Sequence, residues 1–181
     1  MSIRTSEPVW YGVTAEKFTP PFIRSGLKVL DIGAGDGRIT AKLIEMVGKD
    51  NVWALEPNPK SYAQLVALLG ANKRYKQKTL QEALKSDPQT FKEAFDVVTV
   101  FKYNVPYSER DNFIKALSES VKQEGTVFIT SVEEEKFFKV PGLERVYLIP
   151  YLERYFHIKN RYIKKDEFGF PSYGLLELKR K

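Results

Sequence analysis

The stretch KVLDIGAGDGRIT, residues 28–40, constrains the fold of this chain more than any other part. Its largely apolar residues 29–32 predict a buried strand, and three glycines at alternate positions predict a tight turn. Apolar residues then recur at roughly helical spacing as far as Val47, and Gly48 is typical of a helix end. A strand, a glycine turn and a helix in this order form a corner where backbone N–H groups face a ligand.

Acidic residues in the turn indicate which ligand the corner takes. A dinucleotide fingerprint needs a third small residue at position 38, where this chain has Arg38, and the third glycine comes one residue early, at Gly37. Asp31 and Asp36 would repel a pyrophosphate, and more so as water is excluded. S-adenosylmethionine (SAM) has no phosphate and carries a sulfonium and an ammonium, so an acidic turn suits it.

A second apolar run, residues 52–55, ends at Glu56, nineteen residues after Gly37. In the related dinucleotide folds an acid at this place, the tip of the second strand, accepts hydrogen bonds from the ribose hydroxyls. Glu56 is therefore a candidate ribose ligand.

At these positions the chain resembles class I SAM-dependent methyltransferases, with VLDIGAGDGRIT as the first motif and ALEPNP as the second. The resemblance implies SAM as the cofactor, with its methionine part held by Asp31 and the turn 33–37 and its ribose by Glu56. The alternative is a turn whose glycines serve packing only. The cofactor-binding residues implied by the resemblance are Asp31, Gly33, Ala34, Gly35, Gly37, Glu56, Pro57, Glu82, Ala83 and Phe101.

Glu82 and Ala83 follow a short predicted strand at 75–80. In the resembling family an acid here contacts the adenine amino group, and the next backbone N–H reaches the adenine ring. The glycine that usually precedes this acid is Gln81 in this chain. A solvated glutamate at a helix start is the alternative for Glu82.

Strands and helices alternate along the rest of the chain. Asn58-Pro59 and 108–111 are typical helix starts, and residues 96–101 and 126–130 predict strands. This alternation predicts a parallel sheet with helices on both faces. Residues 155–163 and 173–179 fit the final antiparallel hairpin of the family.

The predicted fold class is therefore α/β, a doubly wound, mainly parallel seven-strand sheet with a C-terminal antiparallel hairpin. The length of 181 residues favours a single domain, 1–181, in which residues 1–26 form an N-terminal lid or a packing segment. A short helix is expected near residues 16–18.

The loop after the fourth predicted strand contains Asn104-Val105-Pro106-Tyr107. It is similar to the N-[LIV]-P-[YF] signature of ribosomal RNA adenine dimethyltransferases. The resemblance implies that Asn104 and a carbonyl at 105 or 106 accept the hydrogens of an exocyclic amine. Tyr107 would stack on the base. Asn104, Pro106 and Tyr107 are thus the candidate catalytic residues, and the alternative is an ordinary loop.

Composition excludes several classes of function. The chain has no cysteine and one histidine, which exclude disulfides and thiolate catalysis and argue against a metal site. No run of 18 apolar residues predicts a membrane span, and the N-terminus has no apolar signal region. These points favour a cytoplasmic protein.

Five of the six net positive charges fall between Lys139 and Lys181, together with eight Phe or Tyr residues. A basic, aromatic surface can attract phosphates and stack bases, so RNA or DNA is a candidate partner. A hairpin with tyrosines packed inward and lysines solvated is the alternative.

The leading functional prediction is methyl transfer from SAM to an amino group on nucleic acid. The alternatives are a small-molecule or protein methyltransferase of the same fold, and a non-catalytic SAM-binding or RNA-binding accessory domain.

Overall fold

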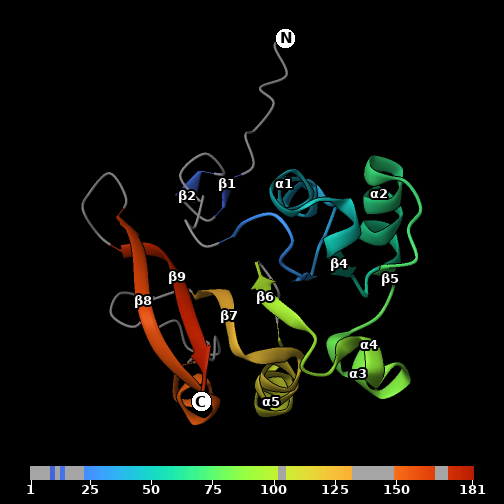
Figure 1. Cartoon of the computed structure of the whole chain (residues 1–181). Helices are drawn as coiled ribbons and strands as arrows, with labels where there is room; N and C mark the ends of the chain where they lie inside the picture. The colour runs from blue at the N-terminus through green and yellow to red at the C-terminus, as the bar shows by residue number, and fades with distance from the viewer. Residues whose placement is uncertain (1–8, 11–12, 15–22, 102–104, 132–148, 166–170) are drawn as a thin grey trace.

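A computed structural model describes residues 9–10, 13–14, 23–101, 105–131, 149–165 and 171–181 (Figure 1). Most of the N-terminal segment 1–26 lies outside these ranges, and so does the expected short helix. Its two described strands, β1 (Val9–Trp10) and β2 (Val13–Thr14), pair antiparallel in a small sheet of their own. The lid or packing role of the segment stays a prediction.

A seven-stranded sheet organises the rest of the described chain, in the order β5-β4-β3-β6-β7-β9-β8. Strands β5, β4, β3, β6 and β7 are parallel, whereas β9 and β8 are antiparallel to their neighbours. The predicted fold class and its C-terminal hairpin are confirmed. The strands are β3 (Val29–Ile32), β4 (Val52–Leu55), β5 (Tyr75–Lys76), β6 (Phe95–Val100), β7 (Val121–Ser131), β8 (Phe156–Lys165) and β9 (Pro171–Arg180).

Helices cover both faces of this sheet (Figure 1). Val29 packs in a buried cluster with Leu43 of α1, whereas Leu30 packs with Phe113 of α5. Successive strand residues point to opposite faces, which is why two neighbours on β3 serve two cores. The helices on one face are α1 (Arg38–Val47) and α2 (Pro59–Leu69), and those on the other are α3 (Leu80–Ser86), α4 (Pro88–Phe91), α5 (Arg110–Ser120) and α6 (Ile149–Tyr155).

Local sequence signals explain where two of these helices begin and end. The Asn58 side chain accepts the N–H groups of Lys60 and Ser61, at 3.0 and 3.1 Å, and Pro59 occupies the first position of α2. Gly48 and Gly70 follow α1 and α2 with φ of 90° and 77°, a conformation that favours glycine. The predicted limits of both helices are confirmed.

Two other predicted boundaries are wrong. The strand expected at 75–80 is shorter than predicted and consists of β5 alone. It cannot continue, because Thr79 caps α3 through a capping box with Glu82 and Leu80 is already helical. A 3₁₀ turn (Tyr107–Glu109) precedes α5, which begins at Arg110 with no side-chain cap, so the cap predicted at 108–111 is absent from this described part of the chain.

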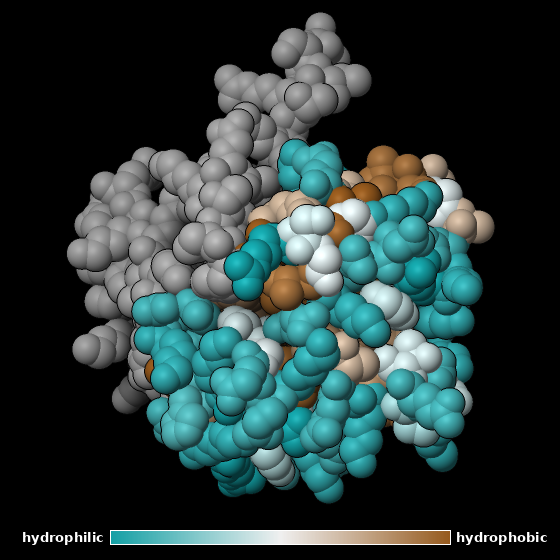
Figure 2. Space-filling view, in the orientation of Figure 1, coloured by the Kyte–Doolittle hydropathy of each residue, from teal (hydrophilic) through white to brown (hydrophobic). Residues whose placement is uncertain are grey.

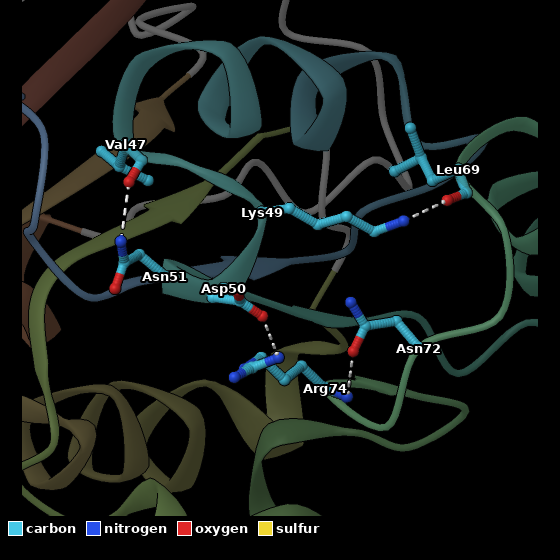
Figure 3. A network of polar contacts seen from close by, with 7 residues as sticks. All are labelled: Val47, Lys49, Asp50, Asn51, Leu69, Asn72 and Arg74. Carbon is cyan, nitrogen blue, oxygen red and sulfur yellow. Dashed lines mark hydrogen bonds and ion pairs between the residues drawn. The ribbon is translucent and has the colours of Figure 1, made fainter.

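A polar network fastens the helices to the sheet at the end opposite the glycine turn (Figure 3). The ion pair of Arg74 with Asp50, 2.9 Å, joins the start of β5 to the short helix before β4. Asn51 donates to the Val47 carbonyl at 2.7 Å, and Lys49 donates to the Leu69 carbonyl at 3.2 Å. The carboxyl ends of α1 and α2 are thereby fixed near the amino ends of β4 and β5.

The described surface is mostly hydrophilic on the face in Figure 2, with a hydrophobic patch at its upper right, where Figure 1 places α2. Leu68 of α2 is 55% exposed, the one large hydrophobic side chain exposed among the described residues. Within the described ranges, no helix has both the length and the apolar character needed to cross a membrane.

Gly125→Ala is expected to destabilise the protein by about 2–3 kcal/mol, the upper part of the range for overpacking. Gly125 lies in β7 next to β6, and an alanine Cβ there would lie 2.5 Å from Cγ2 of Val121 and 3.0 Å from the Phe95 carbonyl oxygen. Urea unfolding measures the change. Gly26→Ala is the matched control, because its Cβ meets no described atom within 4 Å and its φ of +88° opposes alanine by about 1 kcal/mol. Equal losses would contradict the steric argument.

Candidate active site

Backbone hydrogen bonds from the end of β4 hold the glycine turn after β3. The Leu55 carbonyl accepts the N–H groups of Gly33 and Ala34, at 2.8 and 3.1 Å. Gly33, Gly35 and Gly37 have φ of 70°, 59° and 87°, values that side chains strain. The turn therefore needs its glycines for backbone conformation, as the sequence predicts.

Two of the glycines differ in the space around them: Gly37 is tightly packed, whereas Gly35 is open. A Cβ on Gly37 would lie 3.3 Å from both Cα and Cγ of Leu65, so Gly37 lets α2 pack closely against the turn. Among the described residues, a Cβ on Gly35 would meet only the Gly33 carbonyl oxygen, at 3.9 Å. Gly35 therefore leaves room for a ligand against the backbone of the turn.

Glu56 connects the turn to the next helix. Its side chain is 7% exposed, and its two carboxylate oxygens accept the N–H groups of Gly35 and Asn58, each at 2.8 Å. Half-buried Pro57 lies between these contacts. A carboxylate oxygen can accept more than one hydrogen bond, so Glu56 keeps acceptor capacity for the ribose hydroxyls.

Asp31 lies under the turn with 1% exposure. Its carboxylate accepts the hydroxyl of Thr40 at 2.7 Å and that of Thr99 at 2.9 Å. Burial raises the pKa of Asp31 to about 6 although both hydroxyls lower it, and the charge of Glu56 raises it further. Sequence reasoning missed Thr40 and Thr99. The sequence feature that could have identified them is a single hydroxyl residue at an inward-facing position of an otherwise apolar strand or helix face.

The charge of the corner fits a cationic ligand. Asp31, Asp36 and Glu56 place three carboxylates around the turn, whereas Arg38 is the cation that pairs with Asp36, at 2.7 Å. Partial burial opposes ionisation of Asp36, but hydrogen bonds and charge from Arg38 lower its pKa overall. No group of His, Asp or Glu among the described residues has the arrangement of a metal site.

The two residues predicted at the adenine lie in α3. The Glu82 carboxylate is exposed and accepts the N–H and hydroxyl of Thr79, at 2.8 and 2.9 Å. The N–H of buried Ala83 donates to the Thr79 carbonyl at 3.0 Å, which occupies the donor that the predicted contact with the adenine ring would use. The helix begins two residues earlier than the motif alone suggests. A contact between Glu82 and adenine stays a prediction.

The loop after β6 starts beside the glycine turn. Ile32 and Val100 are paired on the adjacent strands β3 and β6, so Gly33 and Phe101 leave the sheet side by side. Phe101 and Val105 are 3% and 6% exposed and anchor the loop to the core. Exposed Pro106 accepts the Glu109 N–H through its carbonyl at 2.9 Å, and Tyr107 begins the 3₁₀ turn. Asn104 lies outside the described residues.

The strand order, the acidic glycine turn and the acid ending β4 together define a class I SAM-dependent methyltransferase site. A family model described as "Methyltransferase domain" matches residues 29–125, more than half of the chain. The chain therefore belongs to this methyltransferase family, and its cofactor is SAM.

Solved structures with the same fold are similar over nearly the whole chain. The 1,6-didemethyltoxoflavin-N1-methyltransferase of Burkholderia thailandensis has a TM-score of 0.71 and 17% identity, covering 98% of this chain and 80% of its own. A SAM-dependent methyltransferase of Aquifex aeolicus has a TM-score of 0.62 and 21% identity, and the match covers 91% of this chain and 88% of its own. The N-methyltransferase NodS of Bradyrhizobium japonicum has a TM-score of 0.63 and 14% identity, and the match covers 87% of this chain and 85% of its own. No match was found among curated proteins.

Glu56→Gln is expected to weaken SAM binding at least about tenfold, because hydrogen bonds to a charged group contribute about 1.5–3 kcal/mol. Isothermal titration calorimetry measures the dissociation constant. Glu45→Gln on α1 is the matched control, since Glu45 is exposed and pairs only with Lys42 among the described contacts. Unchanged affinity in Glu56→Gln would remove Glu56 from the site.

Proposed function

We propose that this enzyme transfers the methyl group of SAM to an amino nitrogen of an adenine-like base in RNA or DNA. The observation that carries the proposal is the sequence Asn104-Val105-Pro106-Tyr107 in the loop 101–107, whose first residue, Phe101, leaves β6 beside the glycine turn. The burial of Phe101 and Val105 supports it, because both side chains fix the loop to the folded core.

The chemistry explains why such a loop would carry these residue types. An exocyclic amine is a weak nucleophile because its lone pair delocalises into the ring. The Asn104 side-chain oxygen and the Val105 carbonyl would accept its two hydrogens and orient its lone pair. Pro106 is less suited to this task, because its carbonyl already accepts the Glu109 N–H.

Alignment supplies the remaining rate acceleration. When bound, SAM supplies an electrophilic methyl group on a sulfonium. The amine forms the new N–C bond as the S–C bond breaks, and it then loses a proton to water. The Tyr107 ring would hold the base flat for this in-line attack.

The C-terminal hairpin supports a polyanionic partner. Lys159 is exposed on β8, and Lys179 and Lys181 follow one another along the last strand and the chain end. Lys179 and Lys181 donate to backbone carbonyls, and neither has an acidic partner among the described contacts. Arg180 differs, because it pairs with Glu93 at 2.7 Å. An intracellular location would follow from a nucleic-acid substrate.

A second candidate is N-methylation of a small flat heterocycle. The likeness to the N1-methyltransferase of Burkholderia thailandensis favours it, because that structure covers 98% of this chain. Both candidates place a planar nitrogen heterocycle at the same loop. They differ in whether phosphates outside the site contribute to binding.

Asn104→Ala is expected to reduce methyl transfer by at least about a hundredfold, since the loss of alignment removes most of the rate, while SAM affinity changes less than twofold. The assay gives methyl-labelled SAM to host-cell extract divided into RNA, DNA, protein and small-molecule fractions. Label in RNA or DNA that the variant loses supports the nucleic-acid proposal.

Asn72→Ala is the matched control for this assay, because Asn72 lies in the polar network at the opposite end of the strands (Figure 3). Label found only among small molecules, and lost in Asn104→Ala, would replace the first candidate with the second. Full turnover by Asn104→Ala would show that the loop has no part in catalysis.

Binding of single-stranded RNA is expected to weaken steeply with salt if the hairpin lysines contact phosphates. Replacing Lys159, Lys179 and Lys181 by Gln should reduce the slope of log K against log salt by about two, because each lost contact removes about 0.7. Fluorescence anisotropy between 50 and 300 mM salt, about the range where such slopes are measured, gives the value.

A variant with Lys85, Lys92 and Lys115 replaced by Gln is the control, since it removes the same charge from exposed positions outside the hairpin. Equal slopes for the two variants would mean that net charge alone, and not the hairpin, attracts RNA.

A further inference from the structure

A buried hydroxyl–carboxylate cluster lies beneath the glycine turn and joins three elements. Asp31 of β3 is paired across the sheet with Thr99 of β6, and its other strand neighbour is Ala54 of β4. Thr40 reaches the same carboxylate from the first turn of α1. Thr40 and Thr99 are each 0% exposed.

This carboxylate has two neutral donors and lacks a cation among its described contacts. Ala54, on the remaining side, has no donor in its side chain. The charged group that acts on Asp31 from β4 is Glu56, which has the same sign. Arg38, near the start of α1, pairs with Asp36 at the surface. An ionised carboxylate buried in this way is unfavourable unless a positive charge compensates it.

The position of Asp31 fits a ligand that brings this charge. Asp31 is two residues before Gly33, and the turn that follows has its open side at Gly35. The methionine end of SAM carries an ammonium, and the neighbouring sulfonium is a second positive charge. Across a few ångströms of protein these charges interact much more strongly than in water.

We propose that Thr40 and Thr99 are positioning residues for the cofactor, whose hydroxyl groups fix the Asp31 carboxylate below the turn so that its charge attracts the ammonium end of SAM. The role belongs to cofactor binding alone. Its test uses no methyl acceptor, so the result does not depend on the proposed acceptor.

The pKa of Asp31 sets the pH range of the effect. It is about 6 in the folded protein against 3.8 as its ordinary value, so the folded chain holds this proton more tightly than the unfolded chain. Without SAM, the contribution of Asp31 to the unfolding free energy therefore falls as pH rises from about 4 to about 6. SAM affinity should rise over about pH 5–7, because the ammonium favours the ionised carboxylate.

The first experiment uses the wild-type protein and calorimetric dissociation constants between pH 5 and 8. SAM is compared with 5′-methylthioadenosine, which keeps the adenosine but lacks the amino-acid part. SAM should bind about tenfold more tightly at pH 7.5 than at pH 5, because about a tenth of a group with a pKa of about 6 is ionised at pH 5. The affinity of 5′-methylthioadenosine should stay nearly constant. Flat profiles for both ligands would overturn the proposal.

The second experiment replaces the hydroxyl groups. Thr99→Val keeps the shape and removes a hydrogen bond to the charged form, so the midpoint of the SAM profile should move up by about one pH unit. Thr99→Ser should restore the wild-type midpoint, and Thr40→Val should resemble Thr99→Val. Thr90→Val, on α4, is the control. A purely structural role would weaken both ligands equally without moving the midpoint, which would also overturn the proposal.

Asp31→Asn keeps the test decisive if the valine variants fail to fold. It removes the charge with little change in shape, so SAM affinity should become independent of pH and match the weak wild-type value at pH 5. The same variant should lose the fall in stability between pH 4 and 6. A wild-type pH profile for SAM in Asp31→Asn would contradict the proposal.

Discussion

The hydrogen bond from the Gly35 N–H to the Glu56 carboxylate, 2.8 Å long, is the contact on which the cofactor corner depends. The other oxygen of that carboxylate accepts the Asn58 N–H, so one side chain joins the glycine turn to the start of α2. The Leu55 carbonyl holds the first half of the turn in the same way. The end of β4 thus fixes the turn through bonds within the protein, and the cofactor meets a prearranged site.

Local rules were sufficient to predict most of the architecture. The alternation of apolar runs with helical periodicity gives the parallel sheet, and Asn58-Pro59 and Gly70 define α2 because capping acts within a few residues. The main glycine turn and Glu56 were predictable for the same reason, since both motifs are short and their spacing is fixed by one crossover. The matching family model and the strand order confirm this part of the prediction.

The remaining features depend on contacts between distant residues. The start of α3 depends on whether Thr79 caps a helix or continues β5, and the cap commits the Ala83 N–H to the Thr79 carbonyl. The Asp31–Thr99 bond joins residues 68 positions apart, a pairing that follows only once the strand order is known. Asn104 lies outside the described residues, so the prediction of its role rests on the four-residue motif alone.

Charge distinguishes this corner from the nucleotide sites that have the same order of strand, glycine turn and helix. A helix N-terminus presents about half a positive charge and by itself favours anions such as phosphate. Here Asp31, Asp36 and Glu56 surround the N-terminus of α1, and Arg38 offsets one of them. Full side-chain charges outweigh the partial charge of the helix, so the potential at the turn becomes negative. A strand–turn–helix corner of the kind that elsewhere binds pyrophosphate thereby favours a cationic methyl donor.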